Sequence, residues 1–172
     1  MRIIAGSHRG RRIAAPRGRA TRPTSDRVRE SAFNLIGPLD DADVIDLYAG
    51  SGALGLEALS RGAARVTFVE SDREACRVIN ANLDALGFRA TVLCQDVARA
   101  LAQDRGDYDL VLCDPPYDAD VGPIAASLAR LVRPDGLLVL EGSSRQEAPA
   151  LPGLAVRTSR RYGSARLTLY EL

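Results

Sequence analysis

A regular alternation of strand-like and helix-like segments restricts the fold more than any other feature of this chain. Five apolar runs occur at 44–48, 65–70, 90–94, 108–113 and 137–141, separated by helical patterns at 54–61, 73–86, 97–102 and 122–131. Such alternation is typical of right-handed βαβ units and predicts a parallel sheet. Two further runs, 155–160 and 165–171, flank a Tyr-Gly-Ser turn and predict an antiparallel hairpin at one edge. The chain is therefore predicted to be α/β, with a mostly parallel seven-stranded sheet.

Two segments outside this alternation contain residues that predict a helix and a turn. Ser25 or Asp26 can cap a helix that runs to Ile36, where Gly-Pro ends it. Arg133–Gly136 has the composition of a turn leading into the last parallel strand.

The loop after the first strand carries a glycine pattern typical of nucleotide binding. Gly50 and Gly52 let the backbone turn tightly and approach a ligand closely, and Asp46 precedes them in the strand. Glu70, at the end of the next strand, is placed to accept hydrogen bonds from ribose hydroxyls. Asp96, after the third strand, is placed to reach an adenine amino group. Together these residues predict a site for an adenosine-containing cofactor.

The glycine pattern alone leaves two cofactor classes to be weighed. Residues 50–55 match the G-x-G-x-x-G of nicotinamide dehydrogenases. Asp46, however, suits a cation better than a pyrophosphate, and S-adenosylmethionine is a cation without phosphate. The chain also has no lysine and a single histidine, His8, so the usual proton donors of hydride chemistry are missing. The residues therefore favour S-adenosylmethionine.

A second site is predicted where the fourth strand ends in Asp114-Pro-Pro-Tyr117. Two prolines stop the buried strand, so Asp114 lies at its carboxyl end, where open α/β sheets bind ligands. Asp114 and the Pro115 carbonyl can accept the two N–H groups of an exocyclic amine, while Tyr117 stacks on the base. A Pro-Pro pair also commonly ends strands that bind no ligand, so the motif alone does not establish a binding site. The glycine pattern upstream supports this interpretation.

Charge is distributed unevenly along the chain. Residues 1–29 hold nine arginines and one acid, a net charge of +8, and residues 30–172 hold 14 arginines and 21 acids, a net charge of −7. Two short apolar pieces, 2–6 and 11–15, are joined by a turn and predict a basic β-hairpin. We therefore expect residues 1–24 to form a basic arm that binds nucleic acid, in preference to a merely solvated arm, and residues 25–172 to form the domain that holds the two predicted sites. The arginines expected to contact the nucleic acid are Arg9, Arg11, Arg12, Arg17, Arg19 and Arg22.

Several classes of protein are disfavoured by composition. The three cysteines form no Cys-x-x-Cys pair, so no zinc site is expected and each cysteine is interpreted as a small buried hydrophobe. No apolar stretch has the length of a membrane span or the form of a signal peptide. A metal-free, monomeric, cytoplasmic protein is expected.

With these motifs in place, the sequence resembles the RsmD-type methyltransferases, bacterial enzymes that use S-adenosylmethionine to methylate N2 of one guanine in 16S ribosomal RNA. The resemblance covers nearly the whole chain. It is carried by residues 2–12, 22–30, 33–34, 46–52, 69–72, 114–117 and 162–163. The 22–30 segment is the most specific of these, whereas the Asp114–Tyr117 motif is shared by many amino-group methyltransferases.

The resemblance implies a Rossmann-like methyltransferase fold with a small N-terminal β-hairpin, and 16S rRNA, free or in the small subunit, as partner. It implies cofactor contacts at Asp46, Tyr48, Gly50, Gly52, Glu70, Ser71, Asp96 and Val97, and target-amine contacts at Asp114, Pro115, Pro116 and Tyr117. Two alternatives stay open. One is an amino-methyltransferase acting on DNA adenine or cytosine, another RNA base or a protein amide. The other is a non-catalytic RNA-binding module.

Overall fold

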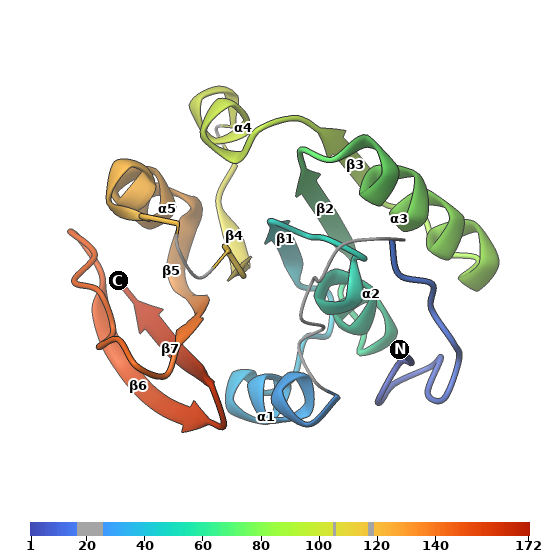
Figure 1. Cartoon of the computed structure of the whole chain (residues 1–172), viewed down its shortest axis with the longest axis horizontal. Helices are drawn as coiled ribbons and strands as arrows, with labels where there is room; N and C mark the ends of the chain where they lie inside the picture. Colours follow the sequence, from blue (N-terminus) through green and yellow to red (C-terminus); the bar gives the residue numbers. More distant parts are fainter. Residues whose placement is uncertain (17–25, 105, 117–118) are drawn as a thin grey trace.

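A single seven-stranded sheet forms the centre of the computed structural model, which describes residues 1–16, 26–104, 106–116 and 119–172 (Figure 1). Its strands are β1 (Asp43–Leu47), β2 (Arg65–Glu70), β3 (Thr91–Cys94), β4 (Tyr108–Cys113), β5 (Val132–Ser143), β6 (Ala155–Tyr162) and β7 (Ala165–Glu171). They lie in the order β3-β2-β1-β4-β5-β7-β6. Strands β1 to β5 run parallel, and β7 pairs antiparallel with both β5 and β6. The predicted fold class and C-terminal hairpin are confirmed.

Helices cover both faces of the sheet. They are α1 (Asp26–Ile36), α2 (Ala53–Ser60), α3 (Arg73–Leu86), α4 (Val97–Gln103), the short 3-10 helix η1 (Gly122–Ile124) and α5 (Ala125–Leu131). Buried side chains of α2 and α3, with Phe33 of α1, pack in one apolar cluster, those of α4 and α5 pack in a second, and Val28 and Ala32 of α1 pack in a third with β7. The central strands β1, β2 and β4 are mostly buried, as expected for parallel strands covered on both faces, whereas the edge strand β3 is not. None of the described helices is long and apolar enough to cross a bilayer.

Helix α3 begins and ends where its sequence predicts. The Asp72 side chain accepts a hydrogen bond from Ala75 N at 2.9 Å and so caps the first turn. Gly87 follows the last turn with a φ of 73°, a left-handed conformation that glycine adopts without a steric penalty. These local signals explain why the predicted bounds of this helix are confirmed.

The turn predicted at Arg133–Gly136 is wrong, because these residues belong to β5. Strand β5 already pairs with β4 at Val132, and the register shifts between Tyr108 and Leu110. Asp135 has a φ of 67°, and a Cβ on Gly136 would lie 2.8 Å from the Tyr108 carbonyl oxygen. The turn-like residues therefore form an irregularity within the ladder, as in a β-bulge, and do not end it.

Residues 1–16, which we call the N-terminal ribbon, pair with themselves in the predicted antiparallel sense. Ile3 N donates to Arg11 O and Gly10 N donates to Ile3 O, each at 2.9 Å. The pairing amounts to one isolated bridge between Arg2 and Arg12, so it is shorter than the predicted hairpin. Ile3 and Ile13 are buried in the same core cluster as α2 and α3. The ribbon is thus packed onto the α/β domain that begins with α1, and the predicted boundary at residues 24 and 25 lies outside the described residues.

Candidate functional site

Acidic side chains lie on four adjacent strands near the carboxyl edge of the sheet. Leu47 of β1 is level with Val69 of β2 and Cys113 of β4, and Cys113 is level with Leu140 of β5. The residues that follow these four are Tyr48, Glu70, Asp114 and Glu141, and the acid of β1 is Asp46, which precedes Leu47. The carboxyl edge of a parallel sheet is where open α/β folds bind ligands. The predicted cofactor acids Asp46 and Glu70 are therefore brought close to the predicted amine-binding residues Asp114 to Pro116, which we call the Asp114 corner.

Asp46 is the most deeply buried acid of this edge. Its Oδ2 accepts a hydrogen bond from Gly55 N at 2.9 Å, which ties β1 to the first turn of α2. Burial raises the pKa of Asp46 to about 7, and the nearby carboxylates of Asp114 and Glu70 act in the same direction. The Gly55 hydrogen bond opposes this shift. A cation beside Asp46 would therefore favour the ionised carboxylate.

The glycine turn between β1 and α2 needs its glycines for two separate reasons. Gly50 and Gly52 have positive φ values of 57° and 78°, which other residues seldom adopt. Gly55 allows close packing, since a Cβ there would lie only 2.3 Å from Cε1 of Phe68. Each glycine of the motif thus has a structural role that keeps the turn compact.

Tyr48 is a strained residue at the start of this turn. It has a φ of 60°, which is unusual for a bulky side chain, and such strain is often found at functional sites. Burial raises the pKa of Tyr48 to about 12, with Cys113 and Asp96 contributing to the shift. Its phenol is therefore neutral at physiological pH.

Glu70 joins the glycine turn to the start of α3. Its Oε2 accepts from Gly50 N at 2.9 Å, and its Oε1 accepts from Asp72 N at 2.8 Å. Ser71 Oγ lies 3.5 Å from the same Oε1. Each carboxylate oxygen has two lone pairs, so these bonds leave room for a ribose hydroxyl. Ribose binding by Glu70 stays a prediction.

Asp96 and Val97 lie at the start of α4. Asp96 Oδ1 accepts from Ala98 N at 2.8 Å and from Arg99 N at 3.3 Å, so the side chain caps this helix. Asp96 is exposed, whereas Val97 is buried beneath it in the second core cluster. The structure thus gives Asp96 a capping role that sequence analysis did not foresee, and its contact with adenine stays a prediction.

The Asp114 corner adjoins the glycine turn directly. Asp114 N donates to Leu47 O at 3.4 Å, which joins the end of β4 to the end of β1. Asp114 is half-buried, Pro115 is buried and Pro116 is exposed. Cys113 is fully buried, and burial raises the pKa of its thiol, so it is a hydrophobic residue of the core. Tyr117 lies outside the described residues.

Glu57 is a buried charged residue whose structural role sequence analysis missed. It is fully buried on α2 and accepts hydrogen bonds from Ile4 N at 2.8 Å, Ala5 N at 3.0 Å and Arg61 Nε at 2.8 Å. It thereby holds the N-terminal ribbon against the helix that follows the glycine turn. The sequence feature that could have identified Glu57 is its position as a single acid within the otherwise uncharged segment Ala53–Ser60.

Asn82 makes the second connection between the ribbon and the site. Its Oδ1 accepts from Ala14 N at 2.8 Å, and its Nδ2 donates to Ala14 O at 3.1 Å. The same Nδ2 donates to Ser51 O in the glycine turn at 3.2 Å. This buried side chain of α3 therefore touches both the ribbon and the predicted cofactor turn.

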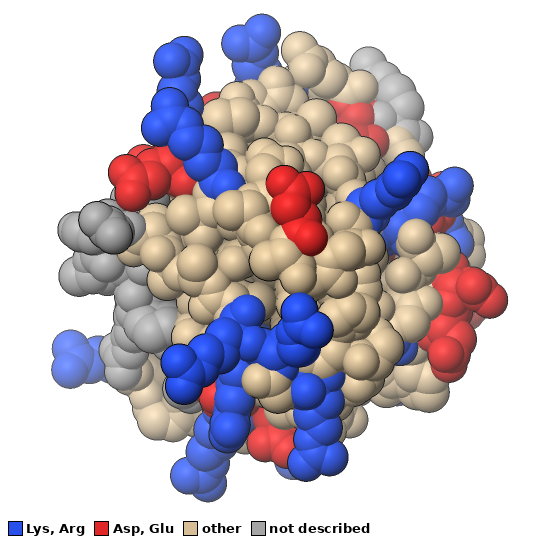
Figure 2. Space-filling model, turned by 90° about the vertical axis from the view of Figure 1, so that its right-hand side faces the viewer, with Lys and Arg blue, Asp and Glu red and all other residues tan. Residues whose placement is uncertain are grey.

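Basic side chains gather on the face formed by the ribbon and α3 (Figure 2). Arg9, Arg11 and Arg12 are exposed there, and Arg11 Nη2 donates to Ala85 O of α3 at 3.2 Å. Arg17, Arg19 and Arg22, also expected to bind RNA, lie outside the described residues. Within the described part of the chain, no cluster of three or more potential metal ligands occurs.

Comparison with known proteins relates this arrangement to a family. The profile described as "Conserved hypothetical protein 95" matches residues 1–171. Bacillus subtilis YlbH, provisionally named as an rRNA methyltransferase, is 38% identical over 181 residues, covering 99% of this chain and 98% of YlbH. The Escherichia coli "Ribosomal RNA small subunit methyltransferase D" is 44% identical over 119 residues, covering 68% of this chain and 60% of that protein. The solved structure of E. coli yhhF, provisionally named as a methyltransferase, has a TM-score of 0.86 at 35% identity, covering 99% of this chain and 96% of that one.

Proposed function

Because this chain belongs to the RsmD-type methyltransferase family, we propose that it transfers a methyl group from S-adenosylmethionine to the N2 amine of a guanine in small-subunit ribosomal RNA. The Rossmann-like methyltransferase fold expected from the resemblance is confirmed by the yhhF structure. The cofactor and the target atom are the parts of this proposal that go beyond family membership.

One observation carries the proposal: the amine-binding corner and the cofactor turn meet at adjacent strand ends. The 3.4 Å contact between Asp114 N and Leu47 O fixes the corner beside the residue that precedes Tyr48. The Asp114 carboxylate lies close enough to contribute to the raised pKa of Asp46. A donor on the glycine turn and an acceptor at the corner would therefore be neighbours.

This placement supports a mechanism based on positioning. The lone pair of an aromatic amine is delocalised into the ring, so the amine is a weak nucleophile. Asp114 and the Pro115 carbonyl are both acceptors, and hydrogen bonds to them would draw the amine toward tetrahedral geometry. S-adenosylmethionine, when bound, supplies an activated methyl group. The protein then has to align donor and acceptor at about 3–3.5 Å and stabilise the positive charge that develops on nitrogen.

The position of the corner also restricts the form of the substrate. A base that is paired within a duplex cannot present its amine at a strand end of the sheet. The guanine must lie in a loop or be flipped out, which costs about a few kcal/mol. Stacking on Tyr117 would return roughly 1–3 kcal/mol of this cost.

Methyl transfer with Asp114→Ala tests the proposal. We expect transfer of tritiated methyl groups to 16S rRNA to fall by about 100- to 1000-fold, because a group that stabilises the transition state is lost. Calorimetry with S-adenosylhomocysteine should show unchanged affinity for the variant. Asp107→Ala, which removes an exposed acid just before the start of the same strand, serves as the matched control. Unchanged turnover in Asp114→Ala would remove Asp114 from the mechanism.

The choice of nucleic acid separates the proposal from its alternatives. Wild-type protein should methylate 16S rRNA, free or in assembled small subunits, and nucleoside analysis should place the methyl group on N2 of guanine. Transfer to DNA adenine or cytosine would identify a different amino-methyltransferase. Binding to RNA without transfer to any substrate would identify a non-catalytic module.

A further inference from the structure

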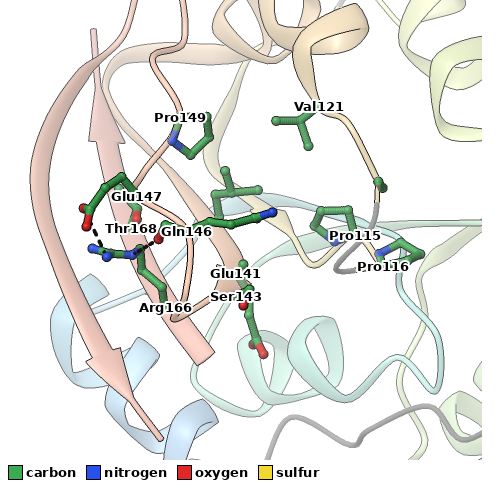
Figure 3. A pocket seen from close by; sticks show the side chains of 13 residues that line it. Pro115, Pro116, Val121, Glu141, Ser143, Gln146, Glu147, Pro149, Arg166 and Thr168 are labelled. Carbon is green, nitrogen blue, oxygen red and sulfur yellow. Dashed lines mark hydrogen bonds and ion pairs between the residues drawn. The ribbon is translucent and has the colours of Figure 1, made fainter. Parts of the chain in front are cut away.

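A small hollow lies beside the Asp114 corner, toward β5 and β7 and so across β4 from the strand that leads to the glycine turn (Figure 3). Pro115, Pro116, Ala119 and Val121 line one side, and the end of β5, the adjoining loop and β7 line the rest. It encloses about 60 Å³, which is room for a few water-sized groups and not for a whole base. The hollow can therefore accept one edge of a ring whose amine lies at the corner.

The loop that forms the far wall is fastened by a buried arginine of β7. Arg166 is 8% exposed, and its Nε donates to the backbone oxygen of Gln146 at 2.7 Å. Its Nη1 donates to Ser159 Oγ at 3.1 Å. Its Nη2 forms an ion pair with Glu147 Oε2 at 3.1 Å, without the alignment of a hydrogen bond. The backbone of Gln146 is thus held in place by a side chain that is itself fixed on three sides.

Two further hydrogen bonds hold the same loop. Ser144 N donates to Ser164 O in the turn between β6 and β7 at 2.8 Å. Tyr170, fully buried on β7, donates from its hydroxyl to Pro149 O at 2.8 Å. The loop is therefore anchored on both sides of Gln146, as expected of a segment that positions a recognition group.

The side chain of Gln146 extends from this anchored backbone across the hollow toward Pro115 (Figure 3). A primary amide presents a donor and an acceptor side by side. Guanine presents the O6 acceptor and the N1–H donor side by side, next to the N2 amine. With N2 at the Asp114 corner, this edge of the ring would point toward the wall that carries Gln146.

We propose that Gln146 is a specificity-determining residue that binds the O6 and N1–H edge of the target guanine. The inference rests on the proposed function, since it takes the amine at the corner to be N2 of guanine. Arg166 is a positioning residue in this arrangement, because it acts on the base only by holding the backbone of Gln146.

A pair of substrates that differ only at this edge tests the inference. The probes are RNA fragments with either guanosine or 2-aminopurine riboside at the target position. 2-Aminopurine keeps the N2 amine but lacks O6 and the N1 hydrogen. Gln146→Leu should lower kcat/KM for the guanosine fragment by about 10- to 100-fold, the discrimination expected of a two-point contact to a base. Its kcat/KM for 2-aminopurine should stay within about twofold of wild type.

Controls separate this inference from the function on which it rests. Gln103→Leu, which changes an exposed glutamine of α4, should leave both substrates unaffected. S-adenosylhomocysteine affinity should be equal in all three proteins. If Gln146→Leu lowers kcat/KM equally on both substrates, or lowers it on neither, the role of Gln146 is overturned while the proposed function stands. A wild-type protein inactive on the guanosine fragment would overturn the proposed function and this inference with it.

Discussion

At the scale of single residues, Asp46 shows how burial prepares a group for a cationic ligand. Its carboxyl group holds the first turn of α2 through Gly55 and is almost fully excluded from water. A pKa of about 7 leaves it close to half ionised at neutral pH. The ammonium and sulfonium groups of S-adenosylmethionine would favour the ionised form, so binding should be linked to the loss of a proton.

We expect cofactor affinity to rise with pH and then to level off above about pH 7. Below the pKa of Asp46, binding must first ionise the carboxyl group, so affinity should fall by up to about tenfold for each pH unit. Calorimetry from pH 5.5 to 8.5, in buffers with different ionisation enthalpies, would measure both affinity and proton release. Asp46→Asn keeps an acceptor for Gly55 N and should bind weakly with no step near pH 7. An affinity independent of pH in the wild type would contradict the linkage.

At the scale of secondary-structure elements, α2 and α3 both bind the ribbon through buried polar side chains, and Ser60 of α2 contributes by donating to Ala5 O and accepting from His8 N. Glu57 of α2 holds Ile4 and Ala5, and Asn82 of α3 holds Ala14. Asn82 also bonds to Ser51 of the glycine turn. The elements that shape the predicted cofactor site are therefore the same ones that orient the basic ribbon.

Asn82→Ala should loosen the ribbon while the sheet stays folded. Three hydrogen bonds are lost, and the partly buried N–H and carbonyl groups of Ala14 and the carbonyl of Ser51 lose their partner, so the free energy of unfolding should fall by about 2 kcal/mol. Urea unfolding would measure this change, and trypsin cleavage after Arg12 should become faster. Asn80→Ala is the matched control: it is exposed on the same helix, bonds only to Cys76 O and should change stability by less than about 0.5 kcal/mol. Equal effects of the two changes would show that Asn82 has no special role.

The sequence predicted those elements whose signals are local. Helix α3 has its cap and its terminal glycine in the sequence, and β2 and β4 are bounded by charged residues or prolines, so their limits agree with the structure. Arg133–Gly136 has turn composition, but pairing with β4 continues through it, and such pairing depends on a distant strand. Glu57, Asn82 and Gln146 act through residues at least 30 positions away or across a hollow, so no local pattern identifies them.

At the scale of the whole molecule, a basic ribbon is attached to an acidic body. Residues 1–29, of which the ribbon is the first part, carry a net charge of +8 and the remaining residues −7, so the total of +1 hides a strong separation of charge along the chain. Basic side chains gather on the face that carries the ribbon and α3 (Figure 2), and Arg11 of the ribbon contacts the α3 backbone at Ala85. An RNA chain that approaches this protein would be attracted to the ribbon and repelled by much of the rest.

The salt dependence of RNA binding should therefore depend on where charge is removed. Changing Arg9, Arg11 and Arg12 together to alanine should lower the slope of log affinity against log salt by about 2, since each lost phosphate contact releases roughly 0.7 fewer counterions. The matched control changes Arg157, Arg160 and Arg161, three exposed arginines of β6 at the opposite edge of the sheet. Filter binding between 50 and 300 mM salt, in the presence of S-adenosylhomocysteine, would compare the three proteins. Both variants lose the same net charge. Equal slopes of log affinity against log salt in the two variants would therefore mean that RNA responds to the total charge of the molecule. A lower slope in the Arg9, Arg11 and Arg12 variant alone would place the phosphate backbone along the ribbon.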